Sequence, residues 1–323
     1  MSGDARPPDP AQEIVPVCYR HPGRETWIRC GRCERPICPD CMVPASVGFQ
    51  CPECVRAGRA GTRPARTVFG GRTVEDPGYV TKVLIALAVG TFLLQLTLPE
   101  SFTRAMWLVA LAQDPSRGGA VGGVAAGEWY RLLTVALLHG SLIHLGFNMY
   151  ALWLFGPALE AALGRSRFAA LVLVSALGGS AASYAFSRLE QPSVGASGAI
   201  FGLFAAYMVV GRRLGRDISA LVVLLGINVA LGFLVANVDW RAHAGGFITG
   251  GAVAAVVAYA PRARRGLVQT AGYAATALVL LTWVTVRTAE ITGAAPDRVL
   301  RCAVTAPVTA NTFLDCAVDR TTP

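Results

Sequence analysis

Charged residues are scarce in this chain, and lysine is nearly absent. Asp, Glu, Lys and Arg together make up 15% of the 323 residues, and Lys82 is the single lysine. Soluble globular proteins carry about 25% charged residues, so this composition excludes an ordinary soluble domain. Hydrophobic residues instead account for 53% of the chain. The composition predicts an all-α polytopic membrane protein.

Seven stretches of the sequence contain no charged residue and approach the length of a membrane span. A helix needs about 20 residues to cross the hydrocarbon layer of a bilayer. The expected spans lie at residues 83–98, 132–155, 168–186, 194–210, 218–238, 242–260 and 266–286. We therefore expect seven transmembrane helices.

The chain also begins without the short basic-then-apolar pattern of a cleaved signal peptide, so we expect a cytoplasmic amino terminus. Arginines crowd the loops after spans two, four and six, which the positive-inside rule places in the cytoplasm. These are Arg165, Arg167, Arg212, Arg213, Arg216, Arg262, Arg264 and Arg265. An odd number of spans then puts the carboxyl terminus outside the cell membrane. Because the arginines flank spans, the net charge of +9 does not predict nucleic-acid binding.

Cysteine is missing from every expected span, and seven of the nine cysteines lie before residue 55. With one histidine they form four pairs, each with a gap of two residues. The pairs are Cys18 and His21, Cys30 and Cys33, Cys38 and Cys41, and Cys51 and Cys54. Such a gap lets both side chains of a pair reach one tetrahedral zinc ion. Four pairs predict two structural Zn²⁺ sites, with no cofactor for catalysis.

The order of the pairs favours interleaved sites. Only four residues separate Cys33 from Cys38, which is too short for sites built in simple sequence. One zinc ion is then held by Cys18, His21, Cys38 and Cys41, and the other by Cys30, Cys33, Cys51 and Cys54. This module resembles the B-box-type zinc finger, although other cross-braced modules stay open. A disulfide cluster is the alternative, which a reducing cytoplasm disfavours.

Few polar side chains interrupt the spans, and one of them is Ser197, which lies between small residues. A lone serine in a helix usually bonds a carbonyl one turn back, so by itself it predicts no function. The spans also hold His139, His144, Asn148 and His243, and polar groups inside membranes are costly and therefore functional candidates. We expect Ser197 and His243 to lie at similar depth near the outer side, with His144 and Asn148 deeper in a second span that starts at residue 132.

Spacing places these residues on helix faces that meet. His144 and Asn148 are four residues apart and share one face. His243, Gly246 and Gly250 share another, and glycines at four-residue spacing let helix backbones approach closely. The fourth and sixth spans are therefore expected to touch.

A hydroxyl beside an imidazole is the minimum for nucleophilic catalysis, and a histidine, an amide and a backbone N–H are suitable donors to an oxyanion. The spans contain no carboxylate to orient the histidine. Asp239 precedes His243 by four residues but is interpreted as a loop residue. The residues therefore predict a dyad rather than a triad.

Four motifs resemble those of the rhomboid family of intramembrane serine proteases. They are "EWYR" at Glu128–Arg131, "HGSLIHLGFN", "GASG" and "AHAGGFITG", and the resemblance covers roughly residues 80–260. It implies that Ser197 is the nucleophile and that His243 is the general base and acid. His144 and Asn148, with the Ser197 N–H, are then expected to bind the oxyanion.

The resemblance also implies structural roles and a fold. Trp129 and Arg131 are expected to brace the loop 99–130, and Phe201 stands where some members have a tyrosine that stacks on the catalytic histidine. The expected fold is a rhomboid-like six-helix core plus a seventh C-terminal span, preceded by the zinc module.

The expected organisation has six parts. These are a disordered stretch at 1–14, the zinc module at 15–56, a basic linker at 57–79, the catalytic core at 80–260, the seventh helix at 261–287 and an extracytoplasmic tail at 288–323. Cys302 and Cys316 lie in that tail, where a disulfide is permitted, and whether they pair stays open.

The predicted function is cleavage of transmembrane segments near the outer face of the membrane by a serine endopeptidase. The expected partners are membrane-protein substrates, the lipid bilayer and a cytoplasmic protein that binds the zinc module, with no nucleic acid. One alternative is a catalytically inactive rhomboid-like protein that binds membrane clients, although such proteins typically lack the serine or the histidine. A transporter is disfavoured because the spans carry no mid-membrane carboxylate.

Overall fold

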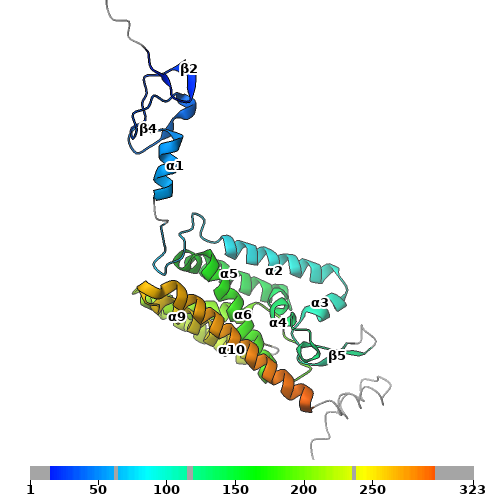
Figure 1. Cartoon of the computed structure of the whole chain (residues 1–323). Coiled ribbons are helices and arrows are strands. Elements are labelled where there is room, and N and C mark those ends of the chain that lie inside the picture. Colours follow the sequence, from blue (N-terminus) through cyan, green and yellow to red (C-terminus); the bar gives the residue numbers. More distant parts are fainter. Residues whose placement is uncertain (1–14, 62–64, 115–118, 235–237, 295–323) are drawn as a thin grey trace, which may run out of the picture. The chain divides into compact units, whose positions relative to one another are not determined.

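A computed structural model describes residues 15–61, 65–114, 119–234 and 238–294 (Figure 1). The chain divides into two compact units, Met1–Pro64 and Ala65–Pro323. The expectations for residues 1–14, for the tail beyond residue 294 and for Cys302 and Cys316 lie outside the described residues.

The N-terminal unit consists of short elements joined by turns. Strand β1 (Val17–Cys18) pairs with β2 (His21–Glu25), the 3₁₀ helix η1 (Pro39–Cys41) follows, and β3 (Val43–Pro44) pairs with β4 (Phe49–Gln50). Helix α1 (Pro52–Gly61) extends past the expected module boundary at residue 56. The buried cluster of this unit contains five cysteines and one aliphatic residue, Ile37. Sulfur therefore takes the place of a hydrophobic core.

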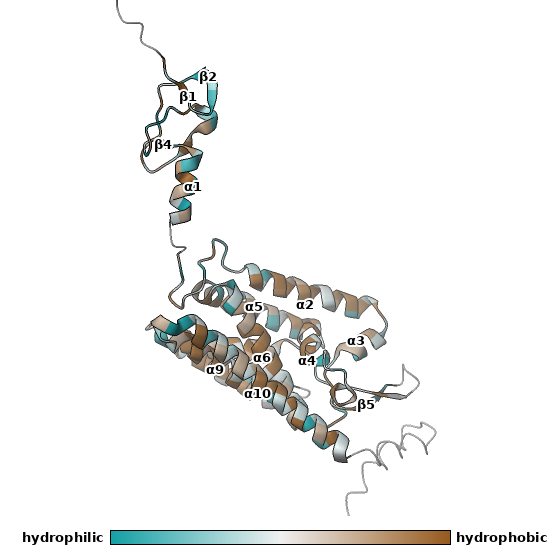
Figure 2. Ribbon diagram, viewed as in Figure 1, coloured by the Kyte–Doolittle hydropathy of each residue, from teal (hydrophilic) through white to brown (hydrophobic). Residues whose placement is uncertain are grey.

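The second unit is a bundle of seven longer helices, counted over the described residues, with mostly apolar surfaces (Figure 2). They are α2 (Tyr79–Thr97), α5 (Leu142–Leu163), α6 (Arg165–Phe186), α7 (Ser197–Arg213), α8 (Ser219–Leu234), α9 (Trp240–Tyr259) and α10 (Arg265–Ala294). Five are long and apolar enough to cross a membrane, namely α2, α5, α6, α9 and α10. Helices α7 and α8, with 17 and 16 residues, are shorter. Each expected span therefore matches a helix, and five of the seven meet the length of a span.

The second expected span, at residues 132–155, is wrong at both ends. Residues Arg131–Thr134 and Val135–Leu137 form the short helices α4 and η4, and α5 begins only at Leu142 and runs through Pro157 to Leu163. The break has a local cause, because Ser141 is extended and its side chain accepts a hydrogen bond from the His144 N–H at 3.1 Å. A serine in this position caps and starts a helix.

A long loop between α2 and α5 carries α3 (Glu100–Met106), the hairpin of β5 (Ala112–Asp114) and β6 (Ala120–Gly122), and η3 (Val124–Ala126). Arg131 is 2% exposed and holds this loop together. Its guanidinium donates to the carbonyls of Arg104 and Trp107 at 2.6 and 2.8 Å and to Glu128 Oε2 at 2.7 Å. The predicted bracing role of Arg131 is confirmed, whereas that of Trp129, which is partly exposed, stays a prediction.

Glycines bring α7 and α9 into backbone contact. A Cβ on Gly246 would overlap the carbonyl oxygen of Gly198, and a Cβ on Gly250 would overlap the backbone of Gly202. The expected contact between the fourth and sixth spans is confirmed. It fixes the register of the two helices that carry Ser197 and His243.

The segment 57–79, expected as a linker, contains a turn that belongs to the helical unit. Phe69 is 2% exposed and packs in the main hydrophobic core. Gly71 lies against the carbonyl oxygen of Leu163, where a Cβ would clash. The turn therefore packs against the C-terminal end of α5 and precedes α2 in the sequence.

Candidate functional site

Ser197 is the first residue of α7 and is half-buried. The loop before it is tied down at two points. Leu108 and Ser193 exchange backbone hydrogen bonds of 3.1 and 2.8 Å, and the Gly195 N–H donates to the Val135 carbonyl at 3.0 Å. Gly195 has φ of 132°, a conformation that glycine tolerates and L-residues rarely adopt. The serine is thus presented from a fixed turn at a helix N-terminus.

His243 lies in the first turn of α9 and faces α7. The ring of Phe201 stacks on the His243 ring with centroids 4.1 Å apart and an interplanar angle of 10°. Phe201 follows Ser197 by one helical turn, so this stack places His243 on the face of α7 that carries the serine. The expected stacking of Phe201 is confirmed. Among the described residues, the structure records no hydrogen bond between the Ser197 hydroxyl and the His243 ring.

His144 approaches the same turn from α5. A Cβ built on Gly195 would lie 2.7 Å from His144 Cε1 and 3.7 Å from Ser197 Oγ, so the three residues share one small space. Asn148 is buried, and its amide donates to the carbonyl of His144 at 2.9 Å. Because α5 begins at Leu142, His144 lies in its first turn. His144, Ser197 and His243 therefore all lie at helix N-terminal ends, and the expected difference in depth disappears.

Asp239 is more than the loop residue that the sequence indicates. It is the N-cap of α9, where its Oδ1 accepts a hydrogen bond from the Ala242 N–H at 3.2 Å. Its Oδ2 accepts from the Ser183 hydroxyl on α6 at 2.5 Å. An aspartate directly before an apolar run is a helix-start signal that could have identified this role.

Gln95 on α2 is a second residue that sequence reasoning missed. Its amide pairs with the backbone of His139, accepting from the His139 N–H at 3.0 Å and donating to the His139 carbonyl at 3.4 Å. The buried His139 ring in turn lies edge-on to the His144 ring, with centroids 5.2 Å apart. A glutamine inside an apolar span was the available signal.

A cavity of about 310 Å³ opens beside His243, between α7, α8 and α9. Its other lining residues are apolar and include Phe201, Val229, Trp240 and Phe247. This arrangement can hold apolar side chains directly beside an imidazole.

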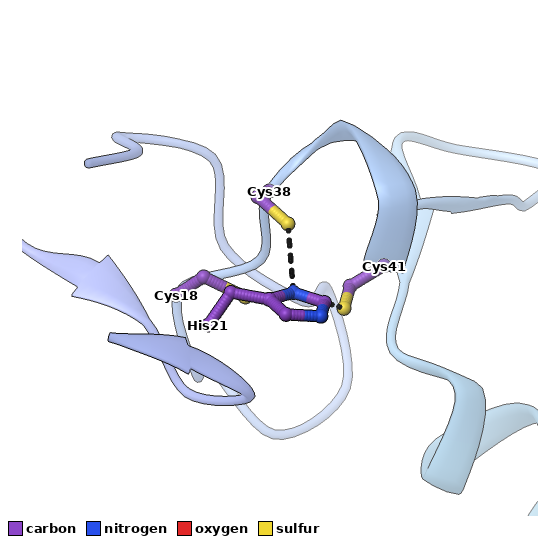
Figure 3. A group of neighbouring side chains, drawn as sticks. All are labelled: Cys18, His21, Cys38 and Cys41. Atoms are coloured by element: carbon purple, nitrogen blue, oxygen red, sulfur yellow. Dashed lines mark hydrogen bonds between the residues drawn. The ribbon is translucent and has the colours of Figure 1, made fainter. Parts of the chain in front are cut away.

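The cysteines and His21 of the N-terminal unit form two groups of four, and Figure 3 shows the group that contains His21. One group is Cys18, His21, Cys38 and Cys41, and the other is Cys30, Cys33, Cys51 and Cys54. The ligand atoms of each group lie within 4.8 Å of one another. The interleaved grouping expected from the sequence is therefore what the structure contains. All seven cysteines are free thiols, which argues against the disulfide alternative.

The geometry of both groups fits a tetrahedral metal ion. His21 Nδ1 lies 3.3 Å from Cys38 Sγ and 3.4 Å from Cys41 Sγ, and the Sγ atoms of Cys33 and Cys51 are 3.8 Å apart. Metal–sulfur bonds of about 2.3 Å at tetrahedral angles put sulfur atoms about 3.8 Å from one another.

The pKa values of the thiols differ within each group. Burial raises the pKa of Cys18 and of Cys30, but hydrogen bonds, mainly from backbone N–H groups, outweigh it and lower both to about 6. Burial and the neighbouring thiols raise the pKa of Cys41 to about 11. Hydrogen bonds to neighbouring cysteines and burial raise that of Cys54 to about 12. One thiolate in each group disfavours the next, so full deprotonation needs a positive charge at the centre.

Known proteins match the part of the helical unit that carries the candidate site residues. The Rhomboid domain matches residues 126–260, a range that contains Ser197, His243, His144 and Asn148. The rhomboid protease GluP of Bacillus subtilis (strain 168) is 43% identical over 148 residues, which cover 43% of this chain and 28% of GluP.

Two further relatives give the same picture. The rhomboid protease candidate YdcA of Bacillus subtilis (strain 168) is 42% identical over 135 residues, which cover 39% of this chain and 68% of YdcA. RHOMBOID-like protein 5 of Arabidopsis thaliana is 38% identical over 135 residues, which cover 39% of this chain and 43% of that protein. The chain thus spans less than half of two of these relatives and about two thirds of the third. With its apolar spans and its matched domain, this multi-pass membrane protein belongs to the rhomboid family.

Proposed function

We propose that the chain is an intramembrane serine endopeptidase that cleaves transmembrane segments of membrane proteins near the outer face of the bilayer. The observation that carries this proposal is the stack of Phe201 on His243, one turn from Ser197 at the start of α7. Because of this stack, the His243 imidazole lies on the face of α7 that carries the Ser197 hydroxyl. Both groups lie at the N-terminal ends of their helices, beside an apolar cavity.

The proposed reaction follows from these positions. The Ser197 Oγ attacks the carbonyl carbon of a peptide bond while His243 takes the hydroxyl proton. The C–N bond then breaks, and His243 returns the proton to the leaving amine. Water hydrolyses the resulting ester, with His243 again as base. Catalytic hydrogen bonds of this kind often form or tighten only in the complex with substrate.

The negative charge of the tetrahedral intermediate is assigned to three donors. The Ser197 N–H lies in the first turn of α7, where backbone N–H groups lack helical partners and favour negative charge. His144 lies beside this turn, whereas the Asn148 amide has one N–H engaged by its own helix. Asn148→Ala should therefore lower turnover by at most about 100–1000-fold, the usual loss for one oxyanion donor.

The direct test is cleavage of a reporter transmembrane segment by purified protein. Ser197→Ala and His243→Ala should each abolish cleavage, and a fluorophosphonate probe should label the wild type at Ser197. Ser180→Ala removes a buried serine of α6 outside the site and serves as the matched control. Full activity of Ser197→Ala would refute the assignment. Absence of both cleavage and labelling in the wild type would favour the client-binding alternative.

For the N-terminal unit we infer two structural Zn²⁺ ions. Each group offers four protein ligands and leaves no open position for water, which is the pattern of structural rather than catalytic zinc. Metal analysis should return two zinc ions per chain. One ion per chain would refute the pairing, and another metal would refute the identity.

We further propose that this unit is cytoplasmic and docks a protein partner or regulates abundance. Removing residues 1–60 should leave cleavage in detergent largely intact while changing substrate choice in cells. An impermeant thiol reagent applied to intact cells should not label Cys18, and labelling from outside would overturn this topology.

A further inference from the structure

Two arginines from distant parts of the sequence hold the turn Thr67–Gly71. The turn is closed by the Thr67 N–H, which donates to the Gly71 carbonyl at 2.8 Å. Arg66 donates from Nη1 to the Gly70 carbonyl at 3.1 Å, and Arg265, the first residue of α10, donates from Nη1 to the Val68 carbonyl at 2.9 Å. The Arg265 side chain also lies against Gly70, where a Cβ would be 2.7 Å from its Cδ.

A third arginine reaches the same turn through a glutamine. Arg167, in the first turn of α6, donates from Nε to Gln269 Oε1 at 2.7 Å. The amide of Gln269, which is 2% exposed, donates to the Phe69 carbonyl at 3.0 Å. Two guanidinium groups thus bind this turn directly, and that of Arg167 is linked to it through Gln269.

The three positive charges have no carboxylate partner in the described part of the chain. Of the acidic residues that follow this turn in sequence or end α5, Asp76 pairs with Lys82 and Glu160 with Arg165, while exposed Glu75 makes no ion pair with the three arginines in the described part of the chain. Each of the three guanidiniums makes one hydrogen bond to the described residues, although arginine has five N–H donors. Buried Arg265 Nε has no partner at all among them.

Three positive charges at this position raise the electrostatic free energy of the protein unless an anion offsets them. Arg167 and Arg265 lie in the first turns of α6 and α10, where the helix dipole already adds partial positive charge. Mutual repulsion of three arginines adds to this. A phosphate group would relieve both effects, because arginine binds it through paired N–H donors.

The surroundings favour a lipid as the source of that phosphate. Helices α6 and α10 are candidate membrane spans, so their first residues lie at an edge of the bilayer. Val68 and Leu267, which neighbour the arginines in sequence, are 66% and 71% exposed and offer apolar surface for acyl chains.

We propose that Arg66, Arg167 and Arg265 form a binding site for the phosphate of an anionic phospholipid, which fastens the turn Thr67–Gly71 to the membrane edge where α6 and α10 begin. The site lies outside the proposed catalytic residues and does not depend on them. Bound lipid would then hold the chain that connects the N-terminal unit to the first span.

The test compares two sets of arginine variants of the full-length chain in detergent. One set combines Arg66→Gln, Arg167→Gln and Arg265→Gln. The control set, Arg262→Gln with Arg264→Gln, removes exposed arginines next to α10 whose side chains make no hydrogen bond to the described residues. Native mass spectrometry and thermal unfolding would be measured with dioleoylphosphatidylglycerol, dioleoylphosphatidylcholine and inorganic phosphate.

We expect phosphatidylglycerol to bind and raise the unfolding temperature of the wild type and of the control set. Its affinity for the triple variant should be at least about tenfold weaker, since each interfacial arginine contributes on that order. Undiminished binding by the triple variant, or an equal loss in the control set, would overturn the proposal. Binding of inorganic phosphate alone with the same dependence would reject the lipid as its source.

A folding defect is separated from a binding defect by milder variants. Arg66→Gln alone changes an exposed side chain, and Arg265→Lys keeps the charge but loses the planar fork. Both should weaken phosphatidylglycerol binding without lowering the unfolding temperature measured in lipid-free detergent. Wild-type binding by both variants would contradict the site.

Discussion

In the N-terminal unit the buried side chains are mostly thiols, whereas in the helical unit a core of aliphatic and aromatic side chains is combined with glycines that let two helix backbones approach. Ile37 is the single aliphatic residue in the buried cluster of the first unit. The second unit buries Phe155, Leu159 and Leu203 and brings Gly246 against Gly198. We therefore expect the first unit to depend on a bound metal ion for its stability, and the α7–α9 contact of the second to depend on the absence of side chains at a few glycines. Perturbations should separate these two dependences.

Removal of metal should have the largest effect and should act on one unit only. Structural zinc contributes about 10–16 kcal/mol to the folding of small domains. Chelation, or Cys38→Ser with Cys51→Ser, should abolish amide protection in residues 15–61 and leave protection in α7 and α9 unchanged. Hydrogen exchange of the full chain measures both regions at once. Cys302→Ser changes a cysteine outside the groups and should keep two zinc ions, and retained protection after chelation would contradict the comparison.

A methyl group at the α7–α9 contact should damage the other unit. Gly246→Ala forces a Cβ into the carbonyl of Gly198, and overpacking of this kind costs about 1–3 kcal/mol or more. We expect a lower unfolding temperature in detergent and loss of reporter cleavage, with zinc content unchanged. Gly226→Ala in α8 is the matched control, because nothing lies within 4 Å of its Cβ position. Equal tolerance of both substitutions would show that the helices do not depend on this contact.

Arg35 should affect the zinc affinity of the all-cysteine group and not that of the group that contains His21. This side chain donates from Nε to Cys33 Sγ at 3.3 Å and from Nη2 to Cys51 Sγ at 3.8 Å, and thus offsets the charge of the all-cysteine group. Arg35→Gln should lower zinc affinity at that group by about 10–100-fold, the usual effect of an outer-shell partner. Chelator competition should show one weakened ion of the two. Arg59→Gln, which changes an exposed side chain of α1, should weaken neither ion.

The smallest effect is expected at the cap of α9. Asp239→Ala removes the N-cap and the bond to Ser183, which should lower stability by about 1 kcal/mol. Because the cap positions the turn that carries His243, we expect a reduced kcat with little change in KM. Asp239→Asn keeps a capping oxygen and should restore most of the activity. If the asparagine variant is as slow as the alanine variant, the negative charge rather than the cap is required.

The features that could be predicted from the sequence are those set by residues a few positions apart. The metal pairing followed from gaps of a few residues, the face shared by His144 and Asn148 from one helical turn, and the contact of α7 with α9 from glycine spacing. These features depend on geometry within one element or on the absence of a side chain.

Features that depend on partners distant in sequence were missed. Charge patterning could not locate the start of α5, because residues 132–141 contain no charged residue, and Ser141 was the local signal for it. Gln95 acquires its role only from the backbone of His139, 44 residues away. Asp239 was interpreted as a loop residue, and its bond to Ser183 on α6 joins residues 56 apart in sequence.

The buried bond from Gln269 to Phe69 has a consequence for biosynthesis. Its two ends are 200 residues apart, so the turn at Phe69 leaves the ribosome long before its partner exists. At about 5–20 residues per second, the wait is roughly 10–40 s. During that interval the Phe69 side chain lacks its final packing against α10, while the cysteine groups ahead of it are already complete. The N-terminal unit can therefore take up metal before the membrane helices finish assembling. The turn at Phe69, which follows this unit in the chain, reaches its final packing only when α10 has been inserted.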